Sequence, residues 1–142
     1  MFARAIVLSL LISVPASLNA QTYARQVWNQ LQAVYDEISD GSSFTLNNYI
    51  IGKLADGAKD TWTFPLTRGR EYLIIGVCDN DCSDVDLTVK DGSGSVVVKD
   101  EGIDDTPVTR FRVTGSGRFT VEVTMADCDD APCFFGFGLF EK

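Results

Sequence analysis

The stretch Asp84-Val85-Asp86-Leu87-Thr88-Val89-Lys90-Asp91-Gly92-Ser93-Gly94 decides the fold of this chain. Val85, Leu87 and Val89 alternate with polar side chains, which is typical of a strand with one buried face, and the last four residues form a turn signal. A second alternating run, Ser116-Gly117-Arg118-Phe119-Thr120-Val121-Glu122-Val123, follows further along. Short alternating strands separated by Asp, Gly and Ser predict an antiparallel β-sandwich.

The same period of two extends over most of residues 44–142. Turn residues divide this region into about eight segments, the number typical of a jelly-roll sandwich. The expected strands are 44–52, 61–66, 72–77, 85–90, 95–99, 110–113, 119–125 and 133–140. The segment 72–77 is apolar on both faces, which predicts a central strand.

Residues 22–39 predict one α-helix in front of the sandwich. Apolar side chains recur there at steps of three and four residues and should share one face: Ala24, Val27, Trp28, Leu31, Val34, Tyr35 and Ile38. Thr22 is suited to cap the start, and Gly41 follows the expected end. We expect this face to pack against the protein's own domain; a surface for a partner is the alternative.

The first twenty residues have the pattern of a secretory signal peptide. One positive charge at Arg4 precedes a short apolar core, and small residues lead to a predicted cleavage after Ala20. The apolar run is too short to cross a bilayer of roughly 30 Å as a helix, although a retained anchor is the alternative. We therefore expect a signal peptide at 1–20, a helix and loop at 21–43, and a sandwich domain at 44–142. The protein should be periplasmic or secreted.

The charge of the chain limits its partners. Without Arg4, 11 basic residues face 20 acidic ones. Nucleic acid and anionic lipid are bound through Lys and Arg, so an acidic protein of this kind is not expected to bind nucleic acid or to insert into a membrane. Cationic partners or divalent metal ions are favoured instead.

Four cysteines occur as two close pairs, Cys78 with Cys82 and Cys128 with Cys133. In an exported chain an even number predicts disulfides, and four cysteines allow three connectivities. The two local pairs are favoured because both enclose a short acidic segment. A zinc site is the alternative, but it would need reduced thiolates and usually a tighter spacing.

Residues 51–140 resemble the bacterial pre-peptidase C-terminal domain, a small β-sandwich found on many secreted peptidases. The resemblance rests on four stretches: Gly52–Phe64 ending in Trp62-Thr63-Phe64, Gly69-Arg70-Glu71-Tyr72, Ser83-Asp84-Val85-Asp86-Leu87 with its 91–94 turn, and Ser116-Gly117-Arg118-Phe119-Thr120-Val121. It implies a non-catalytic domain that assists substrate attachment, localisation or processing. In clostridial collagenases the related domain binds collagen with calcium. This chain departs from the pattern in two ways, since a short helix stands in place of the peptidase and the cysteine pairs are unusual.

The residue types argue against catalysis. The chain contains no His, the commonest general base near neutral pH, and its cysteines are expected to be oxidised. It also lacks a Gly-x-Ser-x-Gly nucleophile motif and a phosphate-binding glycine loop. A pair of carboxylates could hydrolyse a glycosidic bond, but the acidic residues fall mostly in expected loops.

Alternating strand direction should gather the acidic loops at one end of the sandwich. The connections at 53–60, 79–84, 100–106 and 126–132 would share that end with all four cysteines. Its carboxylates would be Asp79, Asp81, Asp84, Asp100, Glu101, Asp104, Asp105, Asp127, Asp129 and Asp130. The opposite end would carry Arg68, Arg70 and Arg118 against Asp91 alone.

Calcium is the metal that this acidic end favours, and it is the only cofactor that we predict. The run 79–84 begins like an EF-hand loop but has Asp84 where Gly is needed and Lys90 where Glu is needed. A site would therefore combine several loops, with Asp79, Asp81, Asp84 and Asp86 as candidate ligands. The alternative is that these carboxylates stabilise tight turns.

Three functions remain open from the sequence. The favoured one is an exported non-catalytic binding or accessory module that acts on a protein or a polysaccharide, with calcium as a candidate helper. The second is an inhibitor or chaperone-like partner of an exported enzyme, with disulfide-braced loops as its contact surface. The third is a small carboxylate hydrolase.

Overall fold

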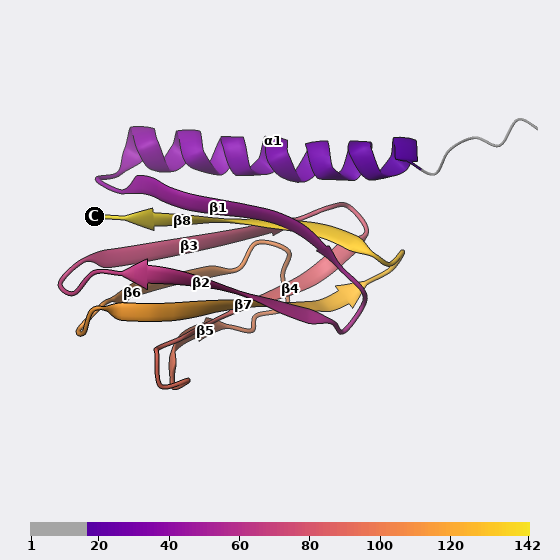
Figure 1. The fold of residues 1–142 in the computed structure, drawn as a ribbon. Helices are drawn as coiled ribbons and strands as arrows, with labels where there is room; N and C mark the ends of the chain where they lie inside the picture. Colours follow the sequence, from indigo (N-terminus) through magenta and orange to yellow (C-terminus); the bar gives the residue numbers. More distant parts are fainter. Residues whose placement is uncertain (1–16) are drawn as a thin grey trace, which may run out of the picture.

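The computed structural model describes residues 17–142, in which one helix precedes two antiparallel sheets (Figure 1). The elements are α1 (Ser17–Gly41), β1 (Thr45–Leu54), β2 (Lys59–Leu66), β3 (Glu71–Cys78), β4 (Cys82–Lys90), β5 (Val96–Asp100), β6 (Val108–Arg112), β7 (Gly117–Cys128) and β8 (Cys133–Glu141). The predicted sandwich with an N-terminal helix is thus confirmed.

The two sheets have the strand orders β1-β8-β3-β6 and β2-β7-β4-β5. This is the arrangement of a jelly roll, in which consecutive strands mostly alternate between the sheets. Turn glycines with positive φ, Gly69 and Gly94, lie at the connections after β2 and β4, where L side chains would be strained. Strand β3 lies between β8 and β6 and is buried on both faces from Tyr72 to Cys78, as its apolar sequence predicted.

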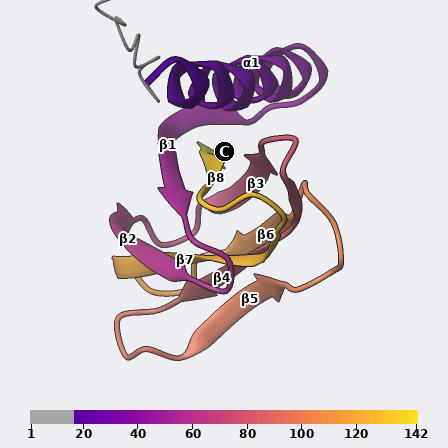
Figure 2. The same ribbon diagram turned by 90° about the vertical axis from the view of Figure 1, so that its right-hand side faces the viewer.

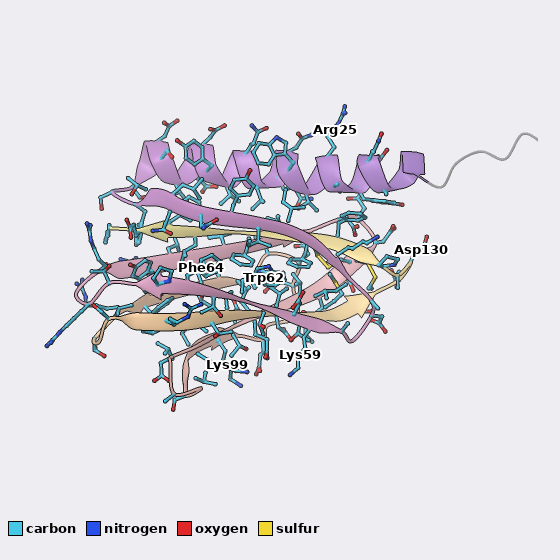
Figure 3. All side chains as sticks on the ribbon, in the orientation of Figure 1. Arg25, Lys59, Trp62, Phe64, Lys99 and Asp130 are labelled. Carbon is cyan, nitrogen blue, oxygen red and sulfur yellow. A yellow bond between two sulfur atoms is a disulfide. The ribbon has the colours of Figure 1, made fainter. Side chains whose placement is uncertain are left out.

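Aromatic side chains fill the space between the sheets. Trp62 and Phe64 point inward from β2 (Figure 3) and contact Phe137 on β8, with ring centroids 5.7 and 6.1 Å apart. Phe135 and Phe137 are at most 1% exposed. The alternation of phenylalanine and glycine in β8 therefore places the rings in the core and the glycines on the outer face.

Helix α1 covers the outer face of the sheet formed by β1, β8 and β3, and leaves the other sheet open (Figure 2). Val27 and Leu31 are buried against Val77, and Val34 and Ile38 pack beside them. The prediction that the helix packs on its own domain is confirmed.

The helix differs from the prediction at its start and along one edge. It begins at Ser17, not near residue 22, so Thr22 lies inside the second turn and is not the cap. Trp28 and Tyr35, predicted on the buried face, stay 38% and 44% exposed. They lie at the margin of the stripe, and Trp28 contacts Tyr49, which is itself 47% exposed.

The predicted signal peptide lies mostly outside the described residues. Only Ser17 to Ala20 of it are described, and they form the first turn of α1. Helix α1 is not long and apolar enough to span a membrane.

Candidate functional site

Four connections meet at one end of the sandwich, which we call the acidic loop end: 55–58, 79–81, 101–107 and 129–132. Backbone hydrogen bonds hold them together. Gly57 N donates to Met125 O at 2.8 Å, Asp129 N donates to Asp81 O at 2.8 Å, and Val85 N donates to Asp104 O at 3.1 Å. Asp130 and the disulfides are seen at this end in Figure 3. The clustering of loops expected from alternating strand direction is therefore found.

Two disulfides brace these loops. Cys78 is bonded to Cys82 and Cys128 to Cys133, the local pairs favoured from the spacing. All four cysteines are at most 6% exposed and belong to the main core. The disulfides thus fix the roots of the β3–β4 and β7–β8 loops.

The carboxylate of Asp79, the first predicted metal ligand, is buried and hydrogen-bonded to the backbone, so its role is structural. The residue is 2% exposed. Its Oδ2 accepts a hydrogen bond from Phe134 N at 2.7 Å, and its Oδ1 accepts one from Asp81 N at 3.2 Å. Burial raises the pKa of Asp79, and these hydrogen bonds oppose that shift.

Asp81, the second predicted ligand, faces the start of helix α1. The Tyr23 hydroxyl hydrogen-bonds to its carboxylate, and this contact raises the pKa of Tyr23. The neighbouring Asn80 side chain accepts a hydrogen bond from Gln26 Nε2. The Cys78–Cys82 loop therefore also anchors the helix.

Asp84 and Asp86, the other two predicted ligands, lie on β4 beside the 101–107 loop. Asp84 Oδ1 is buried without a hydrogen-bond partner in the described structure. Burial raises the pKa of Asp86, and the nearby carboxylates of Asp84, Glu101, Asp100 and Asp104 raise it further. Acidic groups are thus crowded here, and cations are few.

No three acidic or cysteine side chains in residues 17–142 are arranged to hold a metal ion. The four predicted ligands divide into two places, since Asp79 and Asp81 face β8 and α1 while Asp84 and Asp86 face the 101–107 loop. Calcium binding remains a prediction, and a site at Asp84 and Asp86 would need further oxygen ligands from that loop.

The 101–107 loop carries a residue that the sequence did not single out. Ile103 is 92% exposed at its tip. The loop is held by its own carboxylates: Asp100 accepts hydrogen bonds from Gly102 N at 3.1 Å and Val108 N at 2.8 Å, and Asp104 accepts one from Thr106 N at 2.9 Å. A large aliphatic side chain is thereby presented to solvent on a braced loop rimmed with negative charge.

The opposite end of the sandwich is more basic, as expected, although Asp91 is not its only carboxylate. Glu71 at the start of β3 is ion-paired with Arg110 at 2.5 Å, Arg112 at 3.6 Å and Lys142 at 3.4 Å. The Arg110 hydrogen bond is the main reason why the pKa of Glu71 is lowered. These pairs tie the C-terminal residue to β3 and β6.

The geometry expected of a carboxylate hydrolase is not seen in the described hollows. Three surface hollows within residues 17–142 contain at most one carboxylate each. Most acidic side chains of the acidic loop end either project into solvent or accept backbone hydrogen bonds. The arrangement is suited to contact with another molecule.

The fold and this site define a small disulfide-braced jelly-roll module. Its sequence matches no protein-family model and no curated protein. Among solved structures, the pre-peptidase C-terminal domain of collagenase from Bacillus anthracis is 15% identical, with a TM-score of 0.54 over 66% of this chain and 89% of that chain. PliG from Aeromonas hydrophila, a periplasmic lysozyme inhibitor of g-type lysozyme, is 11% identical, with a TM-score of 0.50 over 74% of this chain and 91% of that chain.

At these identities the similarity establishes the fold alone. The resemblance to the pre-peptidase C-terminal domain, predicted from the four sequence stretches, is confirmed in this sense.

Proposed function

We propose that this protein is an exported, non-catalytic module that binds a partner protein through its acidic loop end. The observation that carries the proposal is the placement of Ile103, which is 92% exposed at the tip of a loop that carboxylate-to-backbone hydrogen bonds hold in one conformation. The surrounding carboxylates of Asp100, Glu101, Asp104 and Asp105 favour a partner with an apolar pocket ringed by Lys and Arg.

The braced loops support tight binding at low cost. A loop that already has its bound conformation loses little conformational entropy when a partner binds. The disulfides and the carboxylate-to-backbone hydrogen bonds provide this preorganisation. Opposite charge accelerates association and makes it sensitive to salt.

Export is part of the proposal. Two disulfides within 126 described residues are typical of an oxidising compartment, either the periplasm or the exterior. PliG, one of the two structural neighbours named above, is a periplasmic protein, which supports such a location.

As a second candidate function, we propose that the bound partner is an exported enzyme and that this protein inhibits it. A rigid, protruding loop can enter an enzyme's cleft, and the similarity to PliG covers most of this fold. A lysis assay with a g-type lysozyme tests this form directly, with heat-denatured protein as the control.

The general proposal is tested with two matched variants. The loop variant combines Ile103→Ser, Glu101→Gln and Asp105→Asn, and it spares Asp100 and Asp104 because their carboxylates hold the loop. The control variant carries Arg68→Gln, Arg70→Gln and Arg118→Gln at the opposite end. Proteins captured from the exported fraction by the wild type are identified, and their dissociation constants are measured with all three forms.

We expect the loop variant to bind at least about tenfold more weakly, a loss of 1.4 kcal/mol. The control should bind like the wild type, and added salt should weaken wild-type binding. A partner held equally well by the loop variant, or lost only with the control variant, would contradict the proposal.

A further inference from the structure

A hollow in the surface lies where the start of helix α1 meets the β7–β8 loop. It has a volume of about 420 Å³ and is lined by Ala20, Tyr23, Lys53, Asp130, Ala131, Pro132 and Phe134. The volume lies within the range of small-ligand sites, roughly 300–1,000 Å³. The ring of Tyr23 is stacked on that of Phe134, with centroids 6.5 Å apart and planes 18° apart. One side of the hollow is therefore an aromatic surface.

Two opposite charges face this hollow without pairing. Lys53 on β1 places its Nζ 6.0 Å from the centroid of Phe134. Among the described residues, neither the Lys53 ammonium nor the Asp130 carboxylate has an ion pair or side-chain hydrogen bond. The hollow thus offers a donor group, the Lys53 ammonium over the Phe134 ring, and an acceptor group, the Asp130 carboxylate, beside an apolar surface.

The charges limit the class of ligand. An anion would meet Asp130 and the neighbouring Asp81, whose charge already raises the pKa of Tyr23. A cation would be repelled by Lys53. The ligand that fits is neutral overall, and the Lys53 and Asp130 groups favour one that carries both donors and acceptors, such as a polyhydroxyl compound or a zwitterion.

Energetics favour the polyhydroxyl compound. Ion pairs at exposed positions contribute about 0–1 kcal/mol each, and Lys53 and Asp130 are both exposed. A sugar ring instead covers the aromatic floor with its C–H face, while its hydroxyl groups donate to Asp130 and accept from Lys53. Burial of apolar surface therefore gives the preference for the sugar, and the hydrogen bonds to the two exposed charges set its orientation.

We propose that this hollow binds a neutral saccharide unit. Tyr23, supported by Phe134, forms the stacking surface, Asp130 accepts hydrogen bonds from adjacent hydroxyl groups, and Lys53 donates to a ring or hydroxyl oxygen. The four groups come from α1, β8, the β7–β8 loop and β1, and all lie after the predicted cleavage at Ala20; of the lining residues only Ala20 would be removed by it. The hollow lies on the helix side of the acidic loop end, and Ile103 is not among its lining residues.

The test is NMR titration of the isotopically labelled protein with chitotriose, cellotriose and maltotriose. Glycylglycine serves as the zwitterionic probe and spermidine as the cationic one. We expect at least one trisaccharide to shift the amide signals around Tyr23, Lys53 and 130–134, with a dissociation constant on the order of 1 mM or tighter. The signal of Ile103 should not move.

Variants then distinguish specific binding in the hollow from nonspecific contact with the protein surface. Asp130→Ala, Lys53→Ala and Phe134→Leu should each weaken trisaccharide binding about tenfold, and Leu retains the packing of residue 134 under the helix. Arg25→Ala is the control, because Arg25 projects from α1 into solvent (Figure 3) and is not part of the hollow. The proposal is overturned if only glycylglycine or spermidine binds here, if the sugars shift signals elsewhere, or if none binds.

Discussion

Gly136 lies directly under Leu31: a Cβ atom on Gly136 would come within 2.7 Å of Leu31 Cδ1 and 2.8 Å of Val27 Cγ1. A third neighbour, the carbonyl oxygen of Ile50, would be 3.1 Å away. The glycine in β8 therefore permits the close approach of helix α1 to the sheet. The helix belongs to the core of the domain, although it precedes the sandwich in sequence.

We expect Gly136→Ala to destabilise the protein by about 1–3 kcal/mol, the usual cost of overpacking. Leu31 and Val27 have to shift, and the contact with a backbone oxygen leaves little room. Gly117→Ala is the matched control, since Gly117 also lies in a strand but a Cβ there meets nothing within 4 Å. Urea denaturation measures both, and equal stability of the two variants would contradict this account.

The Cys78–Cys82 disulfide should stabilise the start of helix α1 as well as its own loop. The loop holds Asn80 and Asp81, which contact Gln26 and Tyr23. The bond closes a very short loop, so its removal should cost less than the roughly 3 kcal/mol of a fifteen-residue loop. Hydrogen exchange in the first half of α1 should nevertheless become faster in the double Ala variant.

The Cys128–Cys133 pair provides the comparison for this prediction. It braces the neighbouring loop, and its double Ala variant should change exchange in 129–132 more than in α1. Equal acceleration of α1 exchange in both variants would mean that the first loop does not anchor the helix.

The sequence predicted those features that depend on local periodicity. Alternating residues such as Val85, Leu87 and Val89 gave the strands and their inward faces, and strand alternation placed the acidic loops at one end. The helix was placed by the spacing of Val27 and Leu31, although its start was wrong because the small residues before Ala20 resemble a cleavage site.

Other features depend on packing between distant segments. Asp79 is a residue type that often binds metal ions, and its sequence neighbourhood suggested that role. In the structure it is instead buried just after the central strand β3, where it accepts a hydrogen bond from Phe134 N. Ile103 lies in a loop without periodicity, and only the tertiary structure shows that its side chain is exposed. The hollow joins Tyr23 to Phe134, which are far apart in sequence; no local pattern could have indicated it.

Removing the charge of Asp86 should raise the free energy of unfolding near neutral pH. Burial and then the surrounding carboxylates raise its pKa above the ordinary value of 3.8 in the folded state. The folded protein therefore holds this proton more tightly, and the free energy of unfolding falls as the pH rises through the window above 3.8. Asp86→Asn should stabilise the protein at pH 7 by about 0.5 kcal/mol or more, and the gain should vanish below that window.

Asp91→Asn should show the opposite sign and serves as the control. Hydrogen bonds from Ser93 and Ser95 lower the pKa of Asp91, so its stabilisation is present above 3.8 and is lost as the pH falls through its folded value. Melting temperatures between pH 3 and pH 8 distinguish the two variants. A pH-independent effect of Asp86→Asn would show that packing, not ionisation, is responsible.

The last prediction concerns calcium at the acidic loop end. If Asp84 and Asp86 bind calcium with oxygen atoms of the 101–107 loop, calcium should raise the melting temperature more than sodium at matched ionic strength. Mass action sets the scale, about 2.7 kcal/mol at a hundredfold excess over the dissociation constant. The double variant Asp84→Asn with Asp86→Asn should lose this gain and stay folded. Asp79→Ala should destabilise the protein with or without calcium by about 1–3 kcal/mol, because it leaves the partly buried amide of Phe134 without its acceptor. Equal stabilisation by both salts would show that the ions only screen the repulsion between carboxylates. Calcium binding would then be contradicted, and the proposed role of these carboxylates in binding a partner protein would stand without it.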